Sequence, residues 1–161
     1  MMTNKTNEKN KNQTKMKKIK FLLLMTMVMT MSLTMSADDD DRVITYDQLP
    51  QAAQTFLKAN FATKVPLLVT ADWDDYTIRY ESGEKIEFDR SGDWKDIECY
   101  NSKVPAAAVP AQIASYIQQN YPGKSIIKIE RHRSVYEVKL NNGLEVEFNR
   151  SFQVIDMDYD D

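Results

Sequence analysis

Three residue types that carry much of protein chemistry are scarce in this chain. Its 161 residues include one cysteine (Cys99), one histidine (His132) and four glycines. A single cysteine excludes an intramolecular disulfide, so the fold must be stabilised by burial. A single histidine supplies no Ser/His/Asp triad without an arbitrary choice of serine. The four glycines never cluster into a phosphate-binding loop. We therefore expect no enzymatic activity, no catalytic residues and no cofactor.

The sequence also lacks an apolar run long enough to span a bilayer. Lysines precede the apolar stretch 21–33, and small residues follow it up to Ala37, which is the order of a secretory signal peptide. About fourteen apolar residues at roughly 1.5 Å each fall short of the roughly 30 Å hydrocarbon core. We expect residues 1–37, or 16–37 if translation starts at Met16, to be removed on export. The mature protein is then periplasmic or secreted, without stable membrane insertion.

Basic charge becomes scarce once this leader is removed. Residues 1–37 hold seven of the 21 basic residues and one of the 24 acidic residues, so 14 basic and 23 acidic residues remain, a net charge of −9. A surface of this sign repels phosphate backbones and anionic lipid. The charge therefore argues against nucleic acid as a partner.

What the chain does contain is an internal similarity. Residues 49–91 align with residues 109–151 at a constant offset of sixty, without a gap and with nine identical pairs. Self-similarity at a fixed period indicates two copies of one structural unit. We assign residues 38–45 to an acidic N-terminal segment, 46–102 to a first repeat and 103–161 to a second. The two repeats are expected to form one compact domain.

Each repeat has the pattern of a helix followed by strands. Apolar residues recur at helical spacing over residues 49–60 and 109–120, and they alternate with polar residues after each of these segments. Ser82-Gly83 and Asn142-Gly143 predict tight hairpin turns. The predicted fold class is α+β. It is a tandem repeat of a helix followed by a four-stranded antiparallel meander, with both helices packed on one sheet face.

The motifs of both halves resemble a known family. The first half reads LPQAAQTFLKANF and then YTIRYESGEKIEFDRSGDW, and the second half reads VPAQIASYIQQNYPG and then YEVKLNNGLEVEFNRS. These segments resemble the PepSY-like family of secreted bacterial proteins, which is described as similar in fold to beta-lactamase inhibitory protein. The resemblance implies a location outside the cytoplasm and an inhibitor-like fold, and it brings no catalytic residues. The second half departs from the pattern at residues 152–154, which contain no glycine.

One pair of loops differs between the halves while the surrounding pattern stays alike. The first half has Trp73 where the second has Arg133, and Trp, Tyr and Arg dominate the energetics of protein interfaces. The alternative, that Trp73 only folds onto the sheet edge, stays open. The hypothesis is a partner-binding surface made by these residues: Trp73, Asp74, Asp75, Tyr76, Arg131, His132 and Arg133.

Acidic clusters leave a second function open. Asp89, Ser91 and Asp93 offer the oxygen atoms that calcium accepts, but they do not match an EF-hand loop, and a polar turn explains them more simply. We therefore assign no metal site and keep these three residues as weak calcium candidates. The predicted function is a non-enzymatic protein-binding or inhibitor-like module of the bacterial envelope, whose partner is a protein of the envelope or extracellular space. The alternative is an envelope protein that binds calcium or a small ligand through acidic loops or a groove between the repeats.

Overall fold

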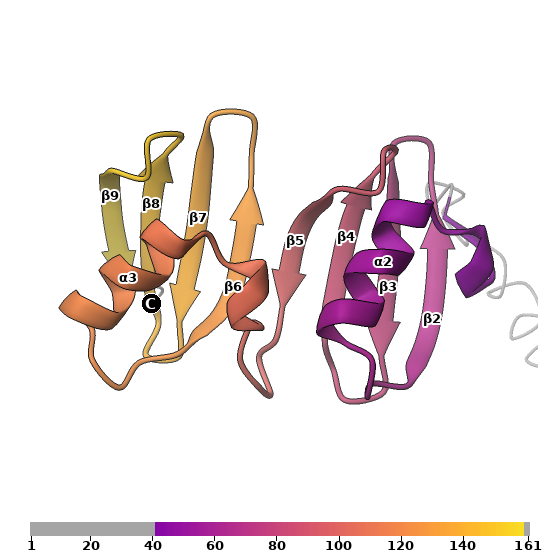
Figure 1. Cartoon of the computed structure of the whole chain (residues 1–161), viewed down its shortest axis with the longest axis horizontal. Helices are drawn as coiled ribbons and strands as arrows, with labels where there is room; N and C mark the ends of the chain where they lie inside the picture. The colour runs from indigo at the N-terminus through magenta and orange to yellow at the C-terminus, as the bar shows by residue number, and fades with distance from the viewer. Residues whose placement is uncertain (1–40, 160–161) are drawn as a thin grey trace, which may run out of the picture. The chain divides into compact units, whose positions relative to one another are not determined.

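The computed structural model describes residues 41–159 (Figure 1). The predicted signal peptide, residues 1–37, lies outside the described residues, as do residues 38–40 of the acidic segment and residues 160–161. Within the described part of the chain, no helix combines the length and the apolar character that crossing a membrane requires.

Nine strands account for much of the described chain, and they form a single antiparallel sheet in the order β1 to β9. The strands are β1 (Arg42–Val43), β2 (Pro66–Ala71), β3 (Asp75–Tyr80), β4 (Lys85–Asp89), β5 (Trp94–Glu98), β6 (Ile126–Arg131), β7 (Val135–Leu140), β8 (Leu144–Asn149) and β9 (Val154–Tyr159). The helical elements are η1 (Tyr46–Gln48), α2 (Gln51–Asn60), η2 (Ala106–Ala108) and α3 (Ala111–Asn120).

The prediction of a tandem repeat of a helix and a four-stranded meander is wrong, although the broad α+β class holds. The strands do not divide into two four-stranded sets, because β5 pairs with β6 and places Ile97 opposite Ile129. In addition, β1 precedes the first helix and pairs with β2 as a further strand. Two separate meanders would leave the inner edges of β5 and β6 with unpaired backbone groups, and joining them satisfies those groups. The alternation of apolar and polar residues predicts a strand, but it does not predict which strand pairs with it.

Both helices cover the same face of the sheet. Figure 1 shows α2 in front of β3 and β4, and α3 in front of β7 and β8. The ring of Phe56 meets Phe88 edge-on at 5.8 Å between centroids, and Tyr116 meets Phe148 in the same way at 5.4 Å. Both phenylalanines on the strands are fully buried. The apolar core therefore lies between the helices and this face of the sheet.

The opposite face of the sheet carries charged side chains in register. Six acidic residues from six neighbouring strands stand directly opposite one another, and we call them the carboxylate row: Glu87, Asp96, Glu130, Glu137, Glu147 and Asp156. Like charges placed opposite each other across strands are destabilising. Lysines relieve part of this repulsion, since Lys85 pairs with Glu87 at 2.9 Å and Lys128 pairs with Glu130 at 2.9 Å.

One acidic side chain lies apart from this row and is buried. Only 2% of the Glu84 side chain is exposed. Its Oε1 accepts hydrogen bonds from Lys64 Nζ at 2.7 Å and Ser102 Oγ at 2.9 Å, and its Oε2 accepts one from Ser82 Oγ. Burial opposes ionisation of Glu84, but the hydrogen bonds from Lys64 and the two serines outweigh it and lower the pKa to about 2. Glu84 thus ties three loop segments together.

Candidate binding groove

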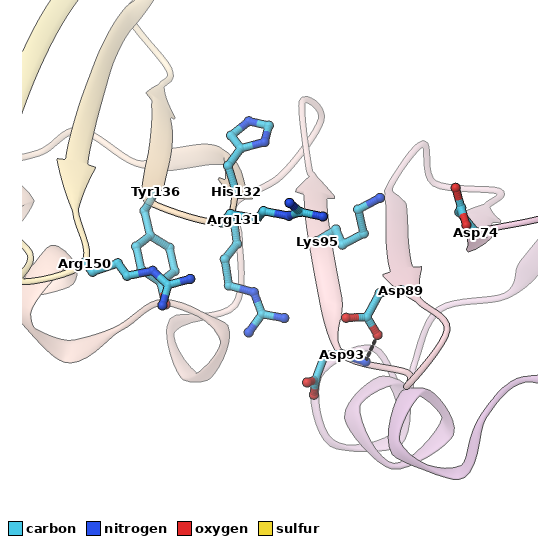
Figure 2. Close-up of a pocket in the computed structure, with 9 residues that line it drawn as sticks. Asp74, Asp89, Asp93, Lys95, Arg131, His132, Tyr136 and Arg150 are labelled. Carbon is cyan, nitrogen blue, oxygen red and sulfur yellow. Dashed lines mark hydrogen bonds between the residues drawn. The ribbon is translucent and has the colours of Figure 1, made fainter.

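Four turns meet at one end of the sheet, because alternate turns of an antiparallel sheet share an end. They are the turns between β2 and β3, β4 and β5, β6 and β7, and β8 and β9. A groove of about 890 Å³ lies at these turns (Figure 2). Its lining residues are Asp74, Asp89, Asp93, Lys95, Arg131, His132, Arg133, Tyr136 and Arg150.

The groove is divided by charge. Its carboxylates come from the turns on either side of β3 and β4, whereas its arginines come from the turns after β6 and β8. Figure 2 shows Arg131 and Arg150 on one side and Asp89 and Asp93 on the other, with Lys95 above the two aspartates. Because β5 and β6 are paired, the acidic wall and the basic wall lie next to each other.

The arginines of the groove lack carboxylate partners. Among the described residues, no ion pair within 4.0 Å involves Arg131, Arg133 or Arg150. The Arg131 guanidinium lies 5.0 Å from the centre of the Trp94 ring, which is the distance of a cation–π contact. This contact positions one guanidinium while its hydrogen-bond donors stay available. The basic wall is therefore suited to an anionic group.

The acidic wall is held in place by a hydrogen-bonded turn. Asp89 Oδ1 accepts hydrogen bonds from the Ser91 backbone N at 2.9 Å, from Ser91 Oγ at 2.5 Å and from the Asp93 backbone N at 3.1 Å. Burial opposes ionisation of Asp89, but these bonds and the nearby Arg131 outweigh it, so its pKa is lowered. Asn149 makes the equivalent backbone bonds after β8 without a charge. The turn explains the Asp89, Ser91 and Asp93 cluster, and calcium binding there stays a prediction.

The structure brings together four of the seven residues predicted as a partner-binding surface. Asp74, Arg131, His132 and Arg133 line the groove. The other three lie nearby without lining it: Trp73 is 79% exposed, Asp75 pairs with Lys95, and Tyr76 packs against the core.

Three lining residues were missed by the sequence reasoning, namely Lys95, Tyr136 and Arg150. The signal for Arg150 was present, because it is identical to Arg90 in the internal alignment and follows a strand that ends at the same side of the sheet. Arg150 belongs to the groove only because the turn after β8 lies at the same end of the sheet as the other three turns. The sequence pattern alone did not show this arrangement.

Two buried titratable groups, Cys99 and Asp96, have strongly raised pKa values. Burial raises the pKa of Cys99 to about 11, so its thiol is protonated at neutral pH and is a poor nucleophile. Burial also raises the pKa of Asp96 well above its usual range, and Glu98 beside it adds to this effect. Neither residue lines the groove, and the lining residues include no serine, threonine or cysteine.

Known proteins share the sequence pattern and the fold that build this groove. The family described as "Putative beta-lactamase-inhibitor-like, PepSY-like" matches residues 37–86 and 74–156. A solved structure of a "putative periplasmic protein" from Bacteroides vulgatus is 44% identical, with a TM-score of 0.72, over 75% of this chain and 98% of that chain. Another, described as a "putative calcium-regulated periplasmic protein" from Bacteroides thetaiotaomicron, is 40% identical, with a TM-score of 0.73, over 74% and 98%.

A second structure from Bacteroides vulgatus is also described as a "putative periplasmic protein". It is 31% identical, with a TM-score of 0.69, and the match covers 73% of this chain and 98% of that chain. None of the curated proteins matches the sequence.

Proposed function

The chain belongs to the PepSY-like, beta-lactamase-inhibitor-like family, and we propose that it is a non-enzymatic binding module of the bacterial periplasm. The location follows that of similar proteins, which are described as periplasmic. The groove at the turns is the proposed recognition surface, and its occupant is an acidic segment of a partner protein.

The observation that carries this proposal is the set of arginines without carboxylate partners. A guanidinium presents planar donors that fit a carboxylate with two parallel hydrogen bonds. Arg131, Arg133 and Arg150 present three such groups around one groove. Across the groove they face aspartates that, within residues 41–159, form no ion pair with them, so an acidic side chain of a partner gains favourable contacts there. A volume of about 890 Å³ accommodates several side chains.

The opposite wall adds specificity. Asp74, Asp89 and Asp93 repel an occupant that is acidic along its whole length and favour a basic residue on that side. The preferred segment thus carries a carboxylate toward the arginines and a cation toward the aspartates. A nucleic acid offers only the first of these charges.

Arginine removal tests this function. The mature protein serves as bait in a periplasmic extract, and the captured protein is purified and titrated by calorimetry. Replacing Arg131, Arg133 and Arg150 by alanine together is expected to weaken binding by about a hundredfold, because interface arginines contribute strongly to affinity. Trp73→Ala, at an exposed position, is expected to weaken binding while the melting temperature stays nearly unchanged.

Arg79 provides the matched control, since it is exposed on β3 and does not line the groove. Arg79→Ala removes the same charge and is expected to leave the affinity within about twofold of the original, as charges outside an interface contribute little. Unchanged affinity in the triple variant, or an equal loss in Arg79→Ala, contradicts the proposal.

Calcium regulation is the second candidate function. Two observations favour it: the 40% identical solved structure is described as a "putative calcium-regulated periplasmic protein", and the carboxylate row concentrates oxygen ligands on one face. Calcium prefers six to eight oxygen ligands. Calorimetric titration of the EDTA-treated mature protein with calcium chloride decides this candidate, and the absence of binding at millimolar calcium rejects it.

A further inference from the structure

We infer that Glu130, His132 and Glu137 form a binding site for a transition-metal dication, of which zinc is the representative. Each residue offers one donor atom, and the three donor atoms lie within 4.8 Å of one another. Glu130 lies near the end of β6, and His132 lies in the hairpin between β6 and β7. Glu137 lies on β7, directly opposite Glu130. Strand pairing and a tight turn thus hold the three ligands together.

Two of the three proposed ligands, Glu130 and His132, are in contact with each other, so a cation must replace that contact. His132 Nε2 lies 2.9 Å from Glu130 Oε1, and Lys128 holds the other oxygen of Glu130. For Glu137, the described residues show no ion pair within 4.0 Å. A metal ion between these groups replaces one contact between Glu130 and His132 and adds positive charge beside Glu137, which already lies near Lys128 and His132.

A buried oxygen atom beside Glu130 points to a ligand independently. Asp96 lies directly opposite Glu130, and 8% of its side chain is exposed. Its Oδ2 is 3.6 Å from Lys85 Nζ, but its Oδ1 is buried and has no hydrogen-bond partner. Buried polar atoms are normally paired, because an unpaired one costs free energy. Glu98 lies beside this carboxyl as a second acid, and a cation held by Glu130 adds positive charge on this side of the sheet.

The ligand types favour a transition metal over calcium at this point. Imidazole nitrogen is a ligand of zinc, copper and nickel, whereas calcium selects oxygen atoms. Zinc binds nitrogen and carboxylate oxygen at about 2.0 to 2.2 Å, so the three donors, which lie within 4.8 Å of one another, must move closer together to share one ion. His132 is exposed, and Figure 2 shows its ring directed away from Arg131 and Arg150.

This site goes beyond the proposed function, because arginine-mediated partner binding requires no metal. The two are nevertheless neighbours, since Arg131 and Arg133 flank His132 in one hairpin. An ion on Glu130, His132 and Glu137 is expected to restrain that hairpin and hence the basic wall of the groove.

Zinc titration tests the inference. Untagged mature protein is treated with EDTA, dialysed, and titrated by calorimetry with zinc chloride and, separately, with calcium chloride. One zinc ion per chain is expected, with weaker calcium binding. His132→Ala and Glu137→Gln are each expected to weaken zinc binding at least tenfold. The imidazole nitrogen signals of His132 are expected to shift in NMR spectra when zinc is added.

Glu81→Gln is the control. Glu81 is exposed in the β3–β4 turn, and its substitution removes the same charge at a distance from the site. Its zinc affinity is expected to equal that of the unmodified protein. Zinc binding that survives His132→Ala unchanged, or no binding at all, overturns the inference. Binding of calcium alone also overturns it and supports the second candidate function. The triple arginine variant is expected to bind zinc normally, so this inference and the groove proposal fail separately.

Discussion

Replacing Glu84 by alanine is expected to lower the free energy of unfolding by about 3 kcal/mol, because it removes the shared acceptor of a buried ion pair. Glu84 is almost fully buried, and its carboxylate accepts hydrogen bonds from Lys64, Ser82 and Ser102. Alanine leaves these donors without their acceptor. The measurement is urea denaturation followed by tryptophan fluorescence, with the change read from the transition midpoint.

The stability lost in Glu84→Ala is also expected to depend on pH. Since the pKa of Glu84 falls from 4.5 in the unfolded chain to about 2 in the folded protein, its stabilising contribution is complete above about pH 4.5 and disappears as the pH falls toward 2. The difference in stability between the unmodified protein and Glu84→Ala therefore shrinks over that interval. A difference that stays constant contradicts this account.

Glu145→Ala is the control for Glu84→Ala. Glu145 pairs with Lys139 at 3.1 Å, but 35% of its side chain is exposed. Ion pairs that water reaches contribute about 1 kcal/mol or less, so this variant is expected to lose clearly less stability than Glu84→Ala. An equal loss of unfolding free energy in both variants contradicts the prediction that the Glu84 pair contributes more than the Glu145 pair.

Replacing Gly92 by alanine is expected to cost about 3 kcal/mol, from backbone strain and overpacking together. Gly92 has a φ of +86°, which side chains rarely adopt, and an added Cβ meets Pro50 Cβ at 2.8 Å and the Ala53 backbone N at 2.9 Å. These atoms belong to the start of α2, whose Ala53 and Leu57 are buried in the core. The turn must then shift, and it carries Asp89 and Asp93 of the groove.

Gly123→Ala separates the two causes. Gly123 has a φ of +81°, but an added Cβ has no neighbour within 4 Å. Backbone strain alone costs about 1 to 2 kcal/mol, so this variant is expected to lose clearly less stability than Gly92→Ala. Equal losses in urea denaturation show that the contact between the turn and α2 contributes nothing.

Local structure was largely predictable from the sequence. The apolar spacing over residues 49–60 and 109–120 anticipated α2 and α3, and Ser82-Gly83 and Asn142-Gly143 marked the turns after β3 and β7. These features depend on neighbours within a few residues. The turn after β8 also forms without glycine, because Phe152 adopts a φ of 60° and its backbone N bonds to the Asn149 carbonyl at 2.9 Å.

Long-range features were not predictable in the same way. The pairing of β5 with β6 depends on which edges need a partner in three dimensions, so the sequence pattern suggested two meanders where one sheet exists. The burial of Glu84 and Asp96 was not predicted, because acidic residues are mostly exposed and the sequence pattern gives no sign of burial at these two positions. Their surroundings come from segments far apart in the sequence.

The candidate groove was anticipated in part. The difference between Trp73 and Arg133 within a similar pattern drew attention to the two hairpins, and Arg131, His132 and Arg133 do line the groove. Lys95 and Arg150 were not anticipated, since their contribution follows from the single sheet that places four turns at one end. Charge and aromatic content identified the loops, and topology determined which loops meet.

Site-specific photo-crosslinking tests the central claim most directly, that the groove at the turns is the recognition surface. A photoreactive amino acid replaces Arg133, which lines the groove, or Thr63, which is exposed in the loop before β2. In cells that export the protein, illumination is expected to yield a crosslinked partner from position 133 and none from position 63. Crosslinking from position 63 without crosslinking from position 133 contradicts the account.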